Sequence, residues 1–357
     1  MSDGLRLDGL TRRYGSNVAL DGITLAIPDD AYISLLGPSG SGKTVLLRVI
    51  AGFEHPDAGA VWLGGRRLDD VPAHLRGIGF VFQNFALFPH LTVRENIGFG
   101  LTNRAVDPVT DPQLVRSRVA DMIGLVGLAG LEDRGVHQIS GGQRQRVALA
   151  RTLVTNPKLV LLDEPLGALD ANLRGRMRGE LKSIRAQLGV TFLHVTGSET
   201  EALAMGDRVI VLDRGRVGQF DVPDTVYNQP ATPNVARFLN CYNIFPGRVD
   251  ADRFVAEGAA FTLGRARPQS GPPAYCIRQD LIAVRHADAP PGPGEAGIQA
   301  RYVTSEYSGA AVTYFFELPD GRAAEVEAHL SHRKPEGLAA QQSYHLVWNA
   351  EQAVVFS

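Results

Sequence analysis

The sequence predicts an α/β protein in which a parallel sheet is followed by a smaller all-β region. Short, unbroken apolar runs, typical of buried parallel strands, alternate with stretches whose apolar residues recur every three or four positions, as on a helix face. A glycine-rich loop follows one of these runs and opens a helix. Beyond about residue 240 the composition changes, and proline and glycine separate short strand-like runs.

The composition excludes several classes of protein. A length of 357 residues allows two or three domains, and the 36 basic and 38 acidic side chains nearly cancel, so we expect no nucleic-acid partner. The two cysteines, Cys241 and Cys276, are too few for a disulfide framework. No apolar run reaches the roughly 18 residues that a membrane helix needs, and residues 1–4 lack an export signal, so we expect a chain that is not exported and does not itself cross a membrane.

The glycine-rich loop has the spacing G-x-x-x-x-G-K-[ST]. It consists of Gly37, Pro38, Ser39, Gly40, Ser41, Gly42, Lys43 and Thr44, and Val45 continues into the helix-like stretch. Glycines let backbone N–H groups converge on phosphate oxygens at a positive helix end, while Lys43 can reach the β- and γ-phosphates and Thr44 can ligate Mg²⁺. An accidental glycine-rich turn would not explain the strand before and the helix after. The loop therefore predicts nucleotide-phosphate binding.

Polar side chains follow two other predicted strands. Gln83 comes directly after the apolar run 78–82, and Asp163 and Glu164 come directly after the run 158–162. Ligands of open parallel sheets bind at the carboxyl ends of the strands, so all three side chains are expected near the phosphates. Asp163 suits Mg²⁺, Glu164 can polarise a water, and Gln83 can do either. The alternative for each is an ordinary turn residue.

Tyr14 lies in the turn of a predicted antiparallel sheet that spans residues 5–27. An aromatic ring at a loop tip can stack on adenine. The alternative is a ring that only packs against its neighbours.

A second glycine-rich segment begins the helix-like stretch 144–155. Ser140 is an N-cap residue, and Gly141 and Gly142, followed by Gln143, leave backbone N–H groups bare at the positive helix end. This segment is a second candidate anion site, or else simply a helix cap.

The region after residue 239 reads as all-β. A hairpin is predicted from runs 311–318 and 323–328 around Pro319-Asp320-Gly321, and further strands at 344–348 and 353–356 complete a small barrel or a pair of barrels.

Taken together and in this order, these motifs resemble those of the ATP-binding-cassette (ABC) ATPases. The resemblance covers residues 5–238, and the segment Ile139 to Gln143 is similar to the family's signature motif. Residues 81–90 and 163–170 resemble the importer ATPases of the spermidine/putrescine, ferric-iron, phosphonate and sugar type, whose carboxyl-terminal TOBE domain matches the proline-rich tail. Among these types, we slightly prefer the polyamine-like branch.

The resemblance implies a P-loop NTPase cassette over residues 1–238 and a small OB-like TOBE domain over residues 239–357. The cassette would combine a RecA-like parallel sheet core, an antiparallel β subdomain and a helical subdomain at about 85–157. ATP and Mg²⁺ are the implied cofactors.

The resemblance also assigns roles to the candidate residues. Tyr14 would stack on adenine, and residues 37–45 would hold the phosphates. Thr44, Gln83 and Asp163 would ligate the metal. Glu164 would be the catalytic base, with Lys43 and Gln83 as the other catalytic side chains.

The implied partners are a second copy of the chain, membrane permease subunits of the inner membrane and, indirectly, a solute-binding protein. In the homodimer, Ser140, Gly141, Gly142 and Gln143 of one copy would bind the γ-phosphate held by the other, and Asp170 would act across the interface. The chain would sit peripherally on the cytoplasmic face of the cell membrane.

One position departs from the family pattern. A histidine that contacts the γ-phosphate normally follows Val195-Thr196, but here Gly197 does, and Ser198 and Glu199 replace Asp-Gln. His194 lies within the preceding strand and points to its opposite face. Losing one such donor costs about 2.7 to 4 kcal/mol in other enzymes. The chain is then either a working ATPase, which we favour, or a nucleotide-binding scaffold that hydrolyses poorly.

Members of the family that act in DNA repair or translation are a third class. They carry two cassettes, zinc modules or long coiled coils. None of these is present in the sequence, so we favour import.

Overall fold

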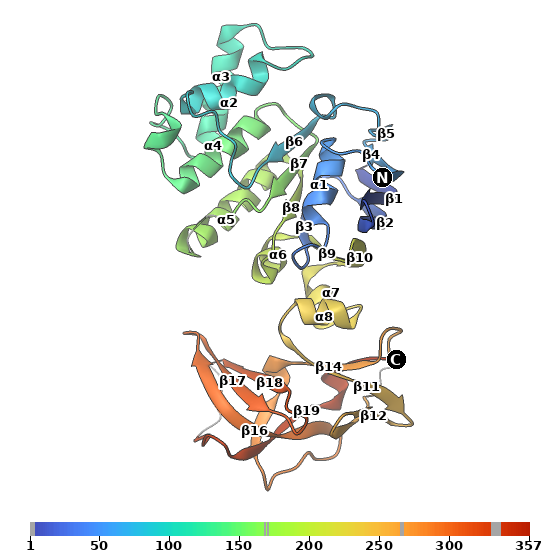
Figure 1. Ribbon diagram of the computed structural model, residues 1–357. Coiled ribbons are helices and arrows are strands. Elements are labelled where there is room, and N and C mark those ends of the chain that lie inside the picture. Colours follow the sequence, from blue (N-terminus) through green and yellow to red (C-terminus); the bar gives the residue numbers. More distant parts are fainter. Residues whose placement is uncertain (1–3, 168, 170, 265–267, 330–336) are drawn as a thin grey trace. The chain divides into compact units, whose positions relative to one another are not determined.

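The computed structural model describes residues 4–167, 169, 171–264, 268–329 and 337–357 (Figure 1). Contacts divide the chain into two compact units, Met1–Val226 and Tyr227–Ser357. None of the helices in the described part of the chain is both long and apolar enough to span a membrane.

A six-stranded sheet forms the centre of the first unit, with the strand order β10-β9-β3-β8-β7-β6. Its members are β3 (Tyr32–Leu36), β6 (Ile78–Val81), β7 (Leu159–Asp163), β8 (Thr191–Val195), β9 (Arg208–Asp213) and β10 (Arg216–Asp221). All neighbours pair in parallel except β10, which is antiparallel to β9. Every residue of β3 and β8 is buried, which confirms the parallel sheet predicted from unbroken apolar runs.

Helix α1 (Lys43–Ala51) lies between this sheet and a second, antiparallel sheet. The second sheet has the order β2-β1-β4-β5 and consists of β1 (Leu5–Tyr14), β2 (Asn17–Ile27), β4 (Ala58–Leu63) and β5 (Arg66–Arg67). Apolar residues of α1 such as Leu46 and Ile50 share one buried cluster with Leu7 of β1 and Leu35 of β3. Tyr14 pairs with Asn17 across the predicted turn, so the β1–β2 hairpin is confirmed.

The remaining helices of this unit gather around a second core. They are α2 (Val93–Thr102), α3 (Pro112–Leu125), α4 (Gly141–Leu153), α5 (Ala171–Leu188) and α6 (Glu199–Met205), with short 3₁₀ turns at Ala73–Leu75 and Val136–Gln138. Buried Ile97 of α2, Val119 and Ile123 of α3 and Val147 of α4 pack together, and the cluster extends to Met177 of α5. The helical character predicted between the strand β6 and the strand β7 is confirmed.

The described residues of the second unit form two five-stranded sheets, with the orders β13-β12-β11-β14-β20 and β15-β19-β16-β17-β18. Their bounds are β11 (Tyr242–Asp250), β12 (Arg253–Ala256), β13 (Ala259–Thr262), β14 (Ala274–Arg278), β15 (Ala283–His286), β16 (Glu295–Tyr307), β17 (Ala311–Glu317), β18 (Ala323–His329), β19 (Ser343–Asn349) and β20 (Val354–Phe356), with 3₁₀ turns at Gln279–Leu281 and Ala350–Gln352. The predicted hairpin is the antiparallel pair β17–β18. Both cysteines are free thiols, with Cys276 buried and Cys241 partly buried.

Two short helices, α7 (Pro223–Asn228) and α8 (Pro233–Phe238), occupy the stretch where the units divide. Within the second unit, α8 lies against β11 and β14. The sequence predicts a domain boundary after residue 238, whereas contacts group the chain from Tyr227 onward with the β-sheets. Where independently folding domains divide stays a prediction.

Candidate nucleotide-binding site

The loop between β3 and α1 has the shape of a phosphate cradle. Gly40 and Gly42 adopt left-handed backbone angles, with φ of 78° and 101°. A Cβ atom added at Gly42 would lie 2.4 Å from the Ala19 carbonyl oxygen, so no larger residue fits. The buried hydroxyl of Ser41 has no hydrogen-bond partner among the described residues. An orphaned donor within a curled, glycine-rich helix start fits phosphate oxygens.

Lys43 points back over this loop. Its ammonium donates to the carbonyl oxygens of Gly37 at 2.6 Å and Pro38 at 2.9 Å. Burial lowers the pKa of Lys43, and the charges of Glu164 and Asp163 partly counter this effect. The ammonium therefore lies within electrostatic reach of both carboxylates. Thr44 is exposed on the first turn of α1, where its hydroxyl is accessible.

The carboxyl ends of β6 and β7 bring the other predicted residues together. Val81 of β6 pairs with Leu162 of β7, so Gln83 and Glu164 emerge side by side. The Gln83 side-chain amide donates to Glu164 Oε2 at 3.0 Å. Glu164 itself has a left-handed φ of 45°, which turns its side chain out of the strand direction. The carboxyl ends of neighbouring parallel strands thus bring Gln83 and Glu164 together, and their place beside the phosphates stays a prediction.

Asp163 is the last residue of β7 and is partly buried. Burial raises the pKa of this carboxyl, as does the neighbouring charge of Glu164, while Arg48 and Lys43 act in the opposite direction. Because burial and a neighbouring negative charge disfavour the ionised form of Asp163, a nearby cation would stabilise that form. No cluster of three His, Cys, Asp or Glu side chains suited to a metal occurs within the described part of the chain, so Mg²⁺ would need phosphate oxygens as further ligands.

Ser140 forms the predicted N-cap of α4, which is a different helix from the one that follows the phosphate loop. Its hydroxyl accepts from the Gln143 backbone N–H at 3.3 Å, and the Gln143 side chain accepts from the Ser140 backbone N–H at 2.8 Å. In Figure 1, α4 and α1 lie apart, with β6 and β7 between them. The first unit therefore presents two separate glycine-rich helix starts. Asp170 lies outside the described residues, and its role stays a prediction.

Comparisons with known proteins identify the family of the chain. A model of the ABC transporter family matches residues 20–167, and a TOBE domain model matches residues 275–356. The spermidine/putrescine import ATP-binding protein of Nitratidesulfovibrio vulgaris is 42% identical over 330 residues, which cover 89% of this chain and 87% of that protein. The chain belongs to the ABC transporter family. It is an importer-type ABC ATPase subunit with a TOBE domain, as the motifs predicted.

Other ABC proteins show the same relationship. The sulfate/thiosulfate import ATP-binding protein of Xanthomonas campestris is 42% identical over 339 residues, which cover 95% of this chain and 96% of that protein. A solved dimeric ATP-binding cassette with bound ADP and phosphate is 31% identical, with a TM-score of 0.54; the match covers 61% of this chain and 98% of that one. The predicted fold, an ABC cassette followed by a TOBE domain, is confirmed.

Gly197 leaves free space at the position where the ABC family normally has the histidine. Gly197 follows β8 with no left-handed backbone angle, and among the described residues no heavy atom, apart from those of its two chain neighbours, lies within 4 Å of where its Cβ would be. His194 is fully buried instead, with Nδ1 2.9 Å from the Tyr32 hydroxyl and Nε2 3.3 Å from a carboxylate oxygen of Glu201. It therefore belongs to the core behind the sheet edge and does not replace the missing donor.

Glu201 anchors the loop around Gly197. Thr196 donates its hydroxyl hydrogen to Glu201 at 2.8 Å, and the Ser198 backbone N–H donates to the same Thr196 hydroxyl at 3.0 Å. Burial raises the pKa of Glu201, but the bonds and charge of His194 and the bond from Thr196 outweigh burial and leave this pKa lowered. The Glu201 carboxylate thus fixes Thr196 directly, and Ser198 through the Thr196 hydroxyl, on the two sides of Gly197.

Arg151 is a structural residue of the ABC cassette that sequence reasoning missed. Its guanidinium donates to the carbonyl oxygens of Phe85 at 3.1 Å and Ala86 at 2.7 Å and lies 5.4 Å from the centre of the Phe88 ring. Phe85 and Ala86 have left-handed φ angles of 64° and 46°. The only signal in the sequence was a basic residue within the otherwise apolar part of α4. Arg151 fixes the segment that follows Gln83.

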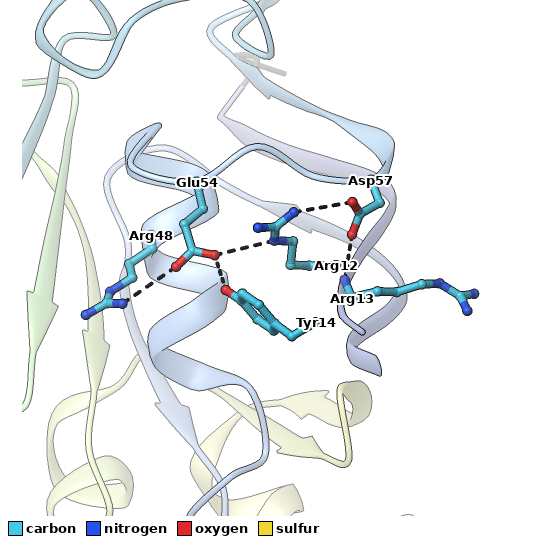
Figure 2. Close-up of polar contacts among 6 residues, drawn as sticks. All are labelled: Arg12, Arg13, Tyr14, Arg48, Glu54 and Asp57. Atoms are coloured by element: carbon cyan, nitrogen blue, oxygen red, sulfur yellow. Dashed lines mark hydrogen bonds and ion pairs between the residues drawn. The ribbon is translucent and has the colours of Figure 1, made fainter. Parts of the chain in front are cut away.

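Tyr14 stands at the end of β1 within a cluster of charged side chains (Figure 2). The Tyr14 hydroxyl donates to Glu54, and the Arg12 guanidinium lies 4.8 Å from the centre of the Tyr14 ring. The side chain of Tyr14 is 43% exposed, so part of the ring remains accessible. The sequence predicted an exposed aromatic at this turn, but not its charged surroundings.

Proposed function

We propose that this chain binds and hydrolyses Mg-ATP to energise the import of a small solute. The observation that carries the proposal is the contact between Gln83 and Glu164 at the sheet edge that also carries Asp163, within electrostatic reach of Lys43. Phosphoryl transfer to water needs one acidic group that holds a cation, one acidic group that accepts a proton, and one fixed ammonium.

Each residue has a defined task in this proposal. ATP bound with Mg²⁺ supplies the phosphoanhydride bond that water breaks. The loop 37–44 and Lys43 hold the phosphates, and Thr44, Asp163 and Gln83 hold the metal. The Glu164 carboxylate accepts a proton from the attacking water, and the Gln83 amide orients that carboxylate.

In this proposal, two copies of the chain together form two complete ATP sites. Ser140 to Gln143 of one copy would face the γ-phosphate held by Lys43 of the other, with Asp170 at the interface. The separation of α4 from α1 within one chain supports this arrangement, because it leaves the two glycine-rich segments on different helices that lie apart. The dimeric solved relative supports it further. The dimer would sit on the cytoplasmic face of the membrane against permease subunits, which receive the solute from a binding protein.

A pair of cap variants tests this arrangement. The caps of α4 and α2 are similar: Thr92 and Glu95 repeat both bonds of Ser140 and Gln143 with the same lengths, 2.8 and 3.3 Å, and the Thr92 hydroxyl also donates to Glu95 at 2.8 Å. Ser140→Ala and Thr92→Ala should each lower the free energy of unfolding by about 1 kcal/mol in urea titrations. Only Ser140→Ala should also weaken Mg-ATP-driven dimerisation, measured by analytical ultracentrifugation. If both variants dimerise equally well, Ser140 acts only as a helix cap.

For the solute, we propose a polyamine. The spermidine/putrescine importer subunit supports this choice, although the sulfate importer subunit is equally identical at 42%. ATP hydrolysis by the complex with its permease and binding protein should rise several-fold with spermidine and stay at the basal rate with sulfate. Stimulation by sulfate and not by spermidine would refute the polyamine assignment while leaving the ATPase proposal intact.

A second candidate function is a scaffold that closes on ATP and hydrolyses it poorly. Gly197 favours it, because glycine offers no side-chain donor beside the γ-phosphate. Hydrolysis by the purified chain distinguishes the two functions.

A further inference from the structure

We propose that Glu54 and Arg12 form a charged frame that holds the Tyr14 ring ready for a purine base, with Arg12 backing one face of the ring and the base taking the other. The inference rests on the proposed stacking role of Tyr14 and adds the residues that position the ring. Glu54 and Arg12 are positioning residues, because they act through Tyr14.

Glu54 fixes the edge of the ring. Its Oε2 atom accepts the Tyr14 hydroxyl hydrogen and lies 3.4 Å from Arg12 Nε, while its Oε1 atom lies 3.6 Å from Arg48 Nη1 (Figure 2). The Glu54 side chain is only 17% exposed. Burial and the bond to Glu54 raise the pKa of Tyr14, so the phenol keeps the proton that it donates. A charge-assisted bond to a partly buried carboxylate restricts rotation of the ring.

Arg12 covers one face of the ring and is itself held in place. Its guanidinium lies 4.8 Å from the ring centre, and its Nη1 atom lies 3.3 Å from Asp57 Oδ1. Asp57 is anchored in turn, because its other oxygen accepts from the Arg13 backbone N–H at 2.6 Å. Because a cation covers one face and 43% of the residue is exposed, a base would stack on the opposite face.

The frame also ties the ring to the phosphate loop. Arg48 belongs to α1, the helix that Lys43 begins, and Glu54 follows the end of that helix. On the other side of the loop, β2 approaches Gly42 so closely that a Cβ there would meet the Ala19 carbonyl. Contacts between neighbouring elements thus link the Tyr14 ring to the phosphate loop. A ring fixed before binding loses less side-chain freedom when the base arrives.

A double-mutant cycle tests the frame by calorimetric titration with Mg-ATP and with Mg-tripolyphosphate, which has no base. Tyr14→Phe keeps the ring but loses the hydroxyl, and Glu54→Gln loses the carboxylate charge. Each should weaken ATP binding about three- to tenfold, and the double variant should bind no more weakly than the weaker single variant. Tripolyphosphate should bind all variants like the wild type, which also verifies that the phosphate site is folded.

Arg12→Gln has a matched control on the same strand. Arg6 also lies 4.8 Å from an aromatic ring centre, that of Trp62, in a cluster separate from Tyr14. Arg12→Gln should weaken ATP binding about threefold, and Arg6→Gln should leave it unchanged. If Arg12→Gln instead tightens ATP binding, Arg12 occupies the face that the base needs, and the frame is wrong.

Tyr14→Ala separates the two proposals. If this variant binds ATP as tightly as the wild type, Tyr14 does not stack on the base, and both the proposed role and the frame fail. If Tyr14→Ala weakens ATP binding while Tyr14→Phe and Glu54→Gln do not, stacking stands and the frame alone is overturned. Additive losses in the cycle would also overturn the frame, because they would show that the two side chains act independently.

Discussion

Replacing Glu164 with glutamine is expected to lower the rate of ATP hydrolysis by about a thousandfold while leaving ATP affinity nearly unchanged. The amide has the size of the carboxylate but cannot accept the proton of the attacking water, and a positioned general base contributes about 10² to 10⁴ in rate. The glutamine oxygen can still accept the bond that Gln83 now makes to Glu164. Phosphate release and equilibrium nucleotide binding, measured on the same preparation, check both parts.

With hydrolysis blocked, Mg-ATP should convert Glu164→Gln into a stable dimer visible by analytical ultracentrifugation. Glu327→Gln, in an exposed ion pair with His329 of the second unit, is the matched control and should hydrolyse ATP at the wild-type rate. Hydrolysis by Glu164→Gln at the wild-type rate would remove Glu164 from the role of base. If the wild type and Glu164→Gln bind ATP and are equally inert, the scaffold interpretation is correct.

Gly197→His is expected to raise the hydrolysis rate on the order of a hundredfold, because it restores a hydrogen-bond donor of the kind that costs about 2.7 to 4 kcal/mol when lost. The backbone at Gly197 is not left-handed, and the described residues leave the space around its Cβ position open, so a side chain can begin there without backbone strain. Glu201 already holds the flanks of the loop through Thr196. The maximal rate of phosphate release at saturating Mg-ATP measures the gain.

Gly197→Ala is the control for this gain, since it adds a side chain without a donor and should leave the rate unchanged. Gly197→His combined with Glu164→Gln should remain inactive, because the donor assists a step that still needs the base. If Gly197→His and Gly197→Ala hydrolyse ATP equally fast, another group already fills the place of the missing donor, and the scaffold interpretation loses its support.

The parts of the site that follow local rules could be predicted from the sequence. The phosphate loop is defined by glycines whose left-handed angles only glycine adopts easily, and strand ends collect Gln83 and Glu164 because parallel strands share one edge. The cap at Ser140 is equally local. Such features depend on a few neighbouring residues and one rule of sheet geometry.

Other features depend on contacts between distant parts of the chain. Arg151 reaches residues 65 and 66 positions away, and Glu54 reaches a tyrosine 40 positions away. Nothing in the local sequence marks Phe85 and Ala86 as left-handed, because both are residues that normally avoid such angles. The assignment of α8 to the second unit likewise reflects packing on β11 and β14, which no motif indicates.

The paired left-handed residues after Gln83 have a mechanical consequence. Each such residue costs roughly 1 kcal/mol relative to a relaxed backbone, so a contact from outside the segment helps to hold Phe85 and Ala86 in this conformation. Arg151, near the end of the helix that Ser140 begins, makes that contact. We therefore expect a shift of α4 to alter the backbone next to Gln83 and, through the bond between Gln83 and Glu164, the position of the carboxylate proposed to accept the proton.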